Sequence, residues 1–209
     1  MRILTLGGLA GPVLFASITI LCAGLRPDYS HVHDFISELG ATNTSHAWLM
    51  NYGGFVPAGL LLAGLGASIR ASLPKQRGTT IGALLIAVFG AGVALSGVFS
   101  CDVGCPQDGG SIQNLIHDRL APFTFLSGSL GAVGLGLGFR SLPPLRSIWI
   151  YSIASGVAGL GLLAAIASTL ETRELTGLWQ RLLLAVLFAW CTVVALRLYR
   201  IDELESPAI

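Results

Sequence analysis

Hydrophobic residues run along the chain in six long stretches that short polar segments separate. The stretches cover residues 4–25, 47–70, 79–100, 118–139, 147–169 and 177–198. Each is long enough to cross a bilayer as a helix, which takes about 20 mostly apolar residues. The pattern predicts an all-α, polytopic membrane protein, built as a compact bundle of six transmembrane helices. We expect a single domain over 1–200 and a short tail at 201–209.

The composition agrees with this pattern. Hydrophobic residues make up 53% of the chain and charged residues only 11%, whereas a soluble domain carries about 25% charged residues. Too few charges are therefore present to cover a surface that faces water. The net charge is +1 and no run of Lys and Arg occurs, so nothing indicates a nucleic-acid partner.

Basic residues in the short loops predict the orientation of the bundle. Most of them fall in the second and fourth loops or near the two ends of the chain: Arg2, Arg70, Lys75, Arg77, Arg140, Arg146, Arg197 and Arg200. Cytoplasmic loops carry an excess of such residues. We therefore expect a multi-pass protein of the cell membrane with both termini in the cytoplasm, and with the first, third and fifth loops outside.

The first polar loop has a helical pattern of its own. Val32, Phe35, Ile36 and Leu39 follow the spacing i, i+3, i+4, i+7, which predicts a short amphipathic helix on the membrane surface. The opposite face of this helix would turn toward water, a lipid headgroup or the other loops. Its residues are His31, His33, Asp34, Ser37 and Glu38.

Further polar residues fall near the outer ends of the predicted helices, where ionisable groups are costly and usually have a partner or a role. One follows the third span, two open the fourth, and two lie one turn into the sixth. Together with two residues of the first loop, the candidates for an outward-facing site are Ser37, Glu38, Asp102, His117, Asp118, Gln180 and Arg181.

Two cysteines, Cys101 and Cys105, flank Asp102 in the third loop. In an exported loop a disulfide between them is the simplest expectation. Free thiols are an alternative. A redox pair that exchanges electrons with a quinone is a weaker one, because the spacing is not Cys-x-x-Cys.

Two chemical hypotheses follow from these residues. In the first, Ser37 is a nucleophile, His117 its base and Asp102 the orienting carboxylate of a lipid hydrolase. No Gly-x-Ser-x-Gly motif surrounds the serine, however. In the second, His117, Asp102 and either His31 or His33 hold zinc. Both signals are weak, and we expect neither a metal nor another cofactor.

A third hypothesis is favoured over both. The polar groups would form a network that docks the first-loop helix and binds a membrane lipid through its headgroup, with Glu38, Asp118, Gln180 and Arg181 as ligand-binding residues. The guanidinium of Arg181 would suit a phosphate. A small-solute transporter comes last, because polar residues within the spans are only Ser and Thr apart from the helix ends.

Several short motifs resemble a known family. In order, they are ISELGA (36–41), the segment 51–54, VFSCD (98–102), LIHD (115–118) and GLWQRL (177–182). With these motifs the chain resembles the bacterial and archaeal membrane proteins catalogued as domain of unknown function 998. The resemblance implies six helices and brings no agreed activity with it.

A more distant likeness is to the DRAM/FRAG-like family of eukaryotic six-helix proteins, which is associated with lipid remodelling, lipid organisation in the plasma membrane and autophagy. It is based on the Ile-Ser-acidic-x-Gly loop and on the histidine that opens the fourth helix. The likeness implies a lipid-facing role in which Ser37, Glu38 and His117 occupy the matching positions. His31 and His33 lie outside the pattern, which counts against the zinc hypothesis.

Overall fold

The structure is a computed structural model of the chain that describes residues 2–107 and 109–205. These residues form six long helices, and no strand occurs among them. The helices are α1 (Arg2–Gly24), α2 (Val56–Ser72), α3 (Arg77–Val98), α4 (Ile112–Phe139), α5 (Trp149–Ser168) and α6 (Thr176–Glu205). Three short elements join them: the 3₁₀ helices η1 (Ile36–Gly40) and η3 (Arg146–Ile148), and a turn of π-helix, η2 (Leu49–Phe55), that leads into α2.

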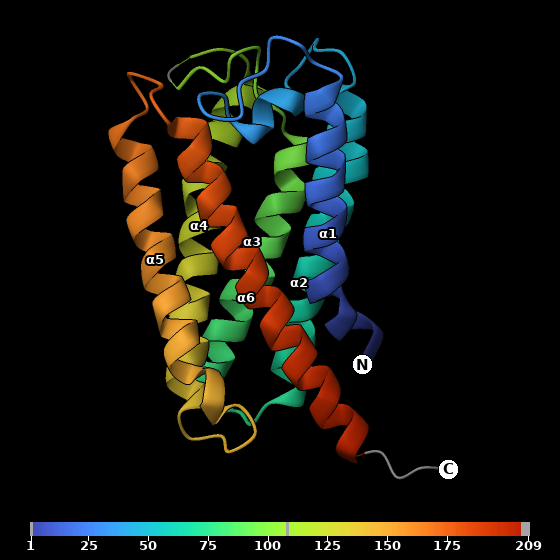
Figure 1. Cartoon of the computed structure of the whole chain (residues 1–209), viewed down its shortest axis with the longest axis vertical. Helices are drawn as coiled ribbons and strands as arrows, with labels where there is room; N and C mark the ends of the chain where they lie inside the picture. Colours follow the sequence, from blue (N-terminus) through green and yellow to red (C-terminus); the bar gives the residue numbers. More distant parts are fainter. Residues whose placement is uncertain (1, 108, 206–209) are drawn as a thin grey trace.

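The helices run alternately up and down, so that loops one, three and five gather at one end of the bundle, and the start of α1 and the end of α6 lie at the other (Figure 1). Each helix packs against the next in sequence, and α6 also packs against α1, which closes the ring. With η2 counted as the start of the second span, all six are long and apolar enough to cross a membrane. The predicted six-helix membrane bundle is confirmed.

Small residues allow the helices to approach closely. A Cβ added at Gly66 of α2 would lie 2.7 Å from the Cα of Ala87, and one added at Gly82 of α3 would lie 2.8 Å from the backbone nitrogen of Leu135. These neighbours are backbone atoms of the adjacent helix, so a larger side chain would push the two helices apart. Close contact of backbones is typical of helix packing in membranes, where water does not drive association.

The fourth helix begins earlier than its hydrophobic stretch suggests. Ser111 is its N-cap and accepts a hydrogen bond from the backbone nitrogen of Asn114 at 3.2 Å. Consequently His117 and Asp118 lie in the second turn of α4 rather than opening it. Hydropathy did not reveal these first turns because they mix exposed apolar side chains with polar ones.

Loop one differs most from the sequence prediction. A short helix does form, but it spans Ile36–Gly40, and all of its residues are buried. Ser37 and Glu38 retain only 8% and 9% of their exposure. Of the three surroundings expected for this face, the structure shows the other loops: Ser37 contacts Cys105 of loop three, and Glu38 pairs with Arg173 of loop five.

At the opposite end of the chain, α6 continues past the predicted boundary at residue 200 and ends at Glu205. Residues 206–209, the last part of the expected tail, lie outside the described residues.

Candidate functional site

Loops one, three and five together form a cap over one end of the bundle. We define the cap as residues 25–48, the described residues of 99–111, and residues 169–175. Backbone hydrogen bonds tie loop one to its neighbours: the nitrogen of Thr42 donates to the carbonyl of Cys101 at 2.8 Å, and the nitrogen of Leu178 donates to the carbonyl of Val32 at 3.0 Å. Within loop three, Cys101 and Cys105 are joined by a disulfide.

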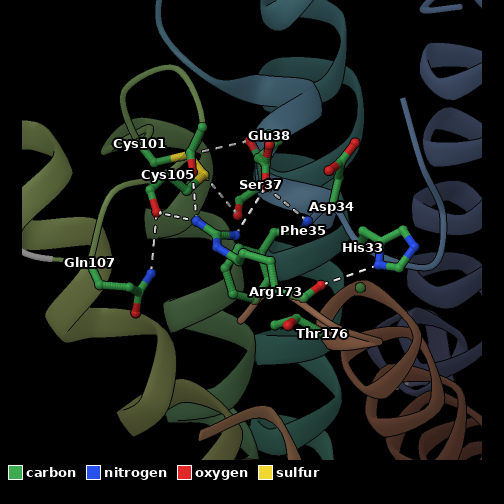
Figure 2. A network of polar contacts seen from close by, with 12 residues as sticks. His33, Asp34, Phe35, Ser37, Glu38, Cys101, Cys105, Gln107, Arg173 and Thr176 are labelled. Atoms are coloured by element: carbon green, nitrogen blue, oxygen red, sulfur yellow. Dashed lines mark hydrogen bonds and ion pairs between the residues drawn. A yellow bond between two sulfur atoms is a disulfide. The ribbon is translucent and has the colours of Figure 1, made fainter. Parts of the chain in front are cut away.

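Arg173, from loop five, holds all three loops together (Figure 2). Its guanidinium donates to the carboxylate of Glu38 at 3.2 Å and to the carbonyls of Gly104 and Cys105 at 2.7 and 2.9 Å. It also lies over the ring of Phe35, 4.6 Å from the centroid. These charge-assisted contacts join residues far apart in sequence, which is why Arg173 did not stand out as a site residue in the sequence.

Glu38 is the acidic partner in this network. Its side chain accepts a hydrogen bond from the backbone nitrogen of Phe35 at 3.1 Å, and its own carbonyl accepts one from Arg26. Burial raises the pKa of the Glu38 carboxyl above its usual value, and nearby Asp34 adds to the rise. The Phe35 N–H, Arg173 and Arg26 act in the opposite direction.

Arg181, the predicted phosphate ligand, also binds loop one. Its guanidinium donates to the carbonyls of Asp34 and Gly177 at 2.9 and 2.8 Å, to the hydroxyl of Tyr29, and to His31 at 3.3 Å. Burial raises the pKa of the Tyr29 hydroxyl to about 12, although Arg181 opposes the rise. Arg181 therefore anchors the cap to α6.

Asp102 and His117, two members of the predicted triad, have different partners. The Asp102 carboxylate accepts hydrogen bonds from the backbone and hydroxyl of Ser111 at 2.6 and 2.9 Å and from the hydroxyl of Thr42 at 3.1 Å. Bonds from Ser111 lower the pKa of Asp102 below its usual value. His117 instead places its Nδ1 2.8 Å from the carbonyl of Phe99, so in this contact Nδ1 carries the proton. Asp102 stabilises loop three and does not orient the imidazole.

Beneath the cap lies a cavity of about 150 Å³. Apolar side chains from η2 and from five of the long helices form much of its wall, among them Phe15, Phe55, Val93, Phe125, Leu163 and Leu184. Polar side chains gather at its cap end, among them Ser37, Gln107, Asn114, His117, Asp118 and Gln180. The cavity therefore has an apolar body and a polar roof, and the disulfide is part of that roof.

Four of the predicted site residues thus line one cavity, and three do not. Ser37, His117, Asp118 and Gln180 belong to its wall, whereas Glu38, Asp102 and Arg181 stabilise the cap around it. The Ser37 hydroxyl lies 3.4 Å from the sulfur of Cys105. Gln180 accepts a hydrogen bond from the backbone nitrogen of Ile36 at 2.7 Å, which fixes loop one directly above the cavity.

The histidines proposed for zinc are dispersed. His31 contacts Arg181, and His33 places its Nδ1 3.3 Å from the carbonyl of Arg173 (Figure 2), while His117 contacts Phe99. Among the residues that the structure describes, no three His, Cys, Asp or Glu side chains are grouped so that they could hold a metal ion.

The fold and the site define a class: a multi-pass membrane protein of six helices whose capped end encloses a cavity with a polar roof. A family model described as "Protein of unknown function (DUF998)" matches residues 9–197, and the chain belongs to this family. Comparison with curated proteins and with solved structures gives no match. The distant likeness to the DRAM/FRAG-like family receives no support from these comparisons and stays a prediction.

Proposed function

We propose that the protein binds a membrane lipid in the cavity beneath the cap. The observation that carries the proposal is that the cavity wall includes exposed residues of two helices that can span a membrane. Pro122 of α4 and Ala167 of α5 line the cavity and are exposed. Both lie within helices that are apolar enough to span the membrane, so a lipid can enter sideways from the bilayer.

The chemistry of the cavity wall matches an amphiphile. The apolar body suits part of an acyl or isoprenoid chain, and the polar roof can hydrogen-bond a headgroup. A cavity of about 150 Å³ holds a molecule of about the size of benzene. The cavity therefore accommodates a headgroup or a short chain segment, and the rest of the lipid would lie against α4 and α5 in the bilayer.

The proposal also covers orientation. Arg70, Arg77, Arg140 and Arg146 lie in or beside the loops that share the end of the bundle with both termini. The excess of basic residues that cytoplasmic loops usually carry supports a cytoplasmic position for that end. The cap then faces outward from the cell membrane, in an environment that permits the disulfide.

Lipid hydrolysis is the weaker candidate. Ser37 and His117 do line the same cavity, but a serine hydrolase also needs a group that orients the histidine. Asp102 has Ser111 and Thr42 as its partners instead. Binding without chemistry agrees better with this arrangement.

Native mass spectrometry of the protein, released from the mildest detergent that keeps it folded, tests the proposal. We expect a lipid adduct on the wild type that is lost in Ala167→Trp, because the indole would fill the cavity where it meets the bilayer. The control is Ala164→Trp, which adds the same side chain to an exposed position of α5 outside the cavity wall, and it should keep the adduct. An unliganded wild type, or equal adducts on all three proteins, would refute binding in the cavity.

A further inference from the structure

We infer that the polar end of the bound lipid is uncharged and carries a hydroxyl or carbonyl oxygen, as in a monoacylglycerol, a prenol or a quinone. This inference rests on the proposed lipid binding and names its ligand class. It depends on the charges that the cavity wall presents and on the hydrogen-bond donors that remain available there.

The guanidinium groups of Arg26, Arg173 and Arg181 are engaged in the cap. Arg173 binds Glu38 and two carbonyls of loop three, Arg181 binds two carbonyls and Tyr29, and Arg26 binds the carbonyl of Glu38. None of the three belongs to the cavity wall. A phosphate in the cavity would thus lack the Arg partner that usually recognises it.

The wall itself also disfavours an anion. Among its described residues it holds no Lys or Arg, and its one carboxylate is Asp118. A phosphate drawn in from the bilayer surface would lose its hydration, gain no fixed positive charge and approach a negative one. Removing a charge from water without a partner is strongly unfavourable, so a phospholipid headgroup does not match this site.

The roof does offer donors for a neutral oxygen. Gln180 uses its side-chain oxygen to accept from Ile36, and no hydrogen bond among the described residues occupies its amide nitrogen. Among the described residues, the hydroxyl of Ser37 has only the sulfur of Cys105 as a side-chain partner, and sulfur is a weak acceptor. Two donors from neighbouring positions can therefore converge on one carbonyl or hydroxyl oxygen of the lipid.

A panel of three lipids with the same oleoyl or oleyl chain tests the ligand class on the purified, disulfide-intact protein. The panel consists of monooleoylglycerol, oleoyl lysophosphatidic acid and oleylamine, each titrated in detergent and quantified by native mass spectrometry. We expect the neutral lipid to bind at least about tenfold more tightly than lysophosphatidic acid, which corresponds to about 1.4 kcal/mol. Oleylamine tests whether the carboxylate of Asp118 selects a cation instead.

Two variants test the donors. Ser37→Ala removes the hydroxyl, and Gln180→Glu keeps an oxygen that can accept from Ile36 but removes the amide N–H groups. Each should weaken monooleoylglycerol about three- to tenfold, the range expected for one hydrogen bond. Ser168→Ala, at an exposed position of α5 outside the wall, should leave affinity unchanged.

The outcomes separate this inference from the proposed function. Preferential binding of lysophosphatidic acid or oleylamine that Ala167→Trp abolishes would overturn the neutral ligand class while keeping lipid binding in the cavity. Binding of all three lipids that Ala167→Trp does not affect would overturn both. Since the panel is measured on the wild type, an unstable Ser37 or Gln180 variant does not prevent a decision on the ligand class.

Discussion

Replacing Arg173 by Ala is the single substitution that should destabilise the cap most. The change removes three charge-assisted hydrogen bonds, to Glu38, Gly104 and Cys105. It also leaves the partly buried carboxylate of Glu38 without its ion-pair partner. Loop five would then lose the hydrogen bonds that join it to both loop one and loop three.

The magnitude follows from the contacts and their exposure. A hydrogen bond to a charged group contributes about 1.5–3 kcal/mol, but such values do not add fully for bonds that share one group. The Arg173 side chain is 30% exposed, so solvent weakens each bond further. We expect a total loss of about 3 kcal/mol, which corresponds to about 6–12 °C in melting temperature for a chain of this size.

The assay is thermal unfolding in detergent, followed by intrinsic tryptophan fluorescence. Arg173→Lys should fall between wild type and Arg173→Ala, because Lys keeps the charge but not the fork of donors that reaches the carbonyls. Arg119→Ala is the matched control: Arg119 is exposed on α4, and its removal should change the melting temperature by no more than about 2 °C. If Arg173→Ala melted as closely to wild type as this control, the cap would not depend on Arg173 and our reasoning would be refuted.

Three further predictions concern individual side chains and glycines. Burial raises the pKa of Glu38 above its ordinary 4.5, so its contribution to stability is full below pH 4.5 and is lost as pH rises through the folded-state pKa. Between pH 4.5 and about 7 the melting temperature should therefore fall more for wild type than for Glu38→Gln, and parallel curves would contradict this. Gly90→Ala should destabilise the protein by about 1–3 kcal/mol, because its Cβ would lie 2.6 Å from the carbonyl carbon of Leu62. A Cβ at Gly161 meets nothing within 4 Å, so Gly161→Ala should have a melting temperature at or above that of wild type. Equal melting temperatures for the two variants would disprove the close contact of α2 and α3. Asp102→Ala and His117→Ala should each lower the melting temperature. Their shifts should add in the double variant because the two side chains have no common hydrogen-bond partner among the described residues, whereas strong coupling would restore the triad hypothesis.

The fold could be predicted because hydropathy is a local property of the chain. Six apolar stretches of sufficient length determine six membrane helices, and alternating spans bring loops one, three and five to one end without further information. The start of α4 was missed because Ser111 caps a mixed segment whose hydropathy is too low to mark a span.

The candidate site could be predicted only in part. Polar residues of loop one and of the helix ends made Ser37, His117 and Gln180 candidates from the sequence, and all three line one cavity. The burial of Glu38 depends on Arg173, 135 positions away in sequence, and no local pattern encodes such a pairing. The apolar residues of α5 that complete the cavity are likewise indistinguishable in sequence from those that face lipid.

Lipid entry from the bilayer into the cavity is the central claim, and photo-crosslinking in membranes tests it most directly. The probe is a neutral monoacylglycerol with a diazirine in its chain, added to membranes that contain the protein, followed by peptide mass spectrometry. We expect adducts on cavity-wall residues such as Phe125, Leu163 and Leu184, and their loss in Ala167→Trp. Adducts confined to exposed positions such as Phe123 and Val157, unchanged in that variant, would show that lipid only surrounds the bundle and would contradict the claim.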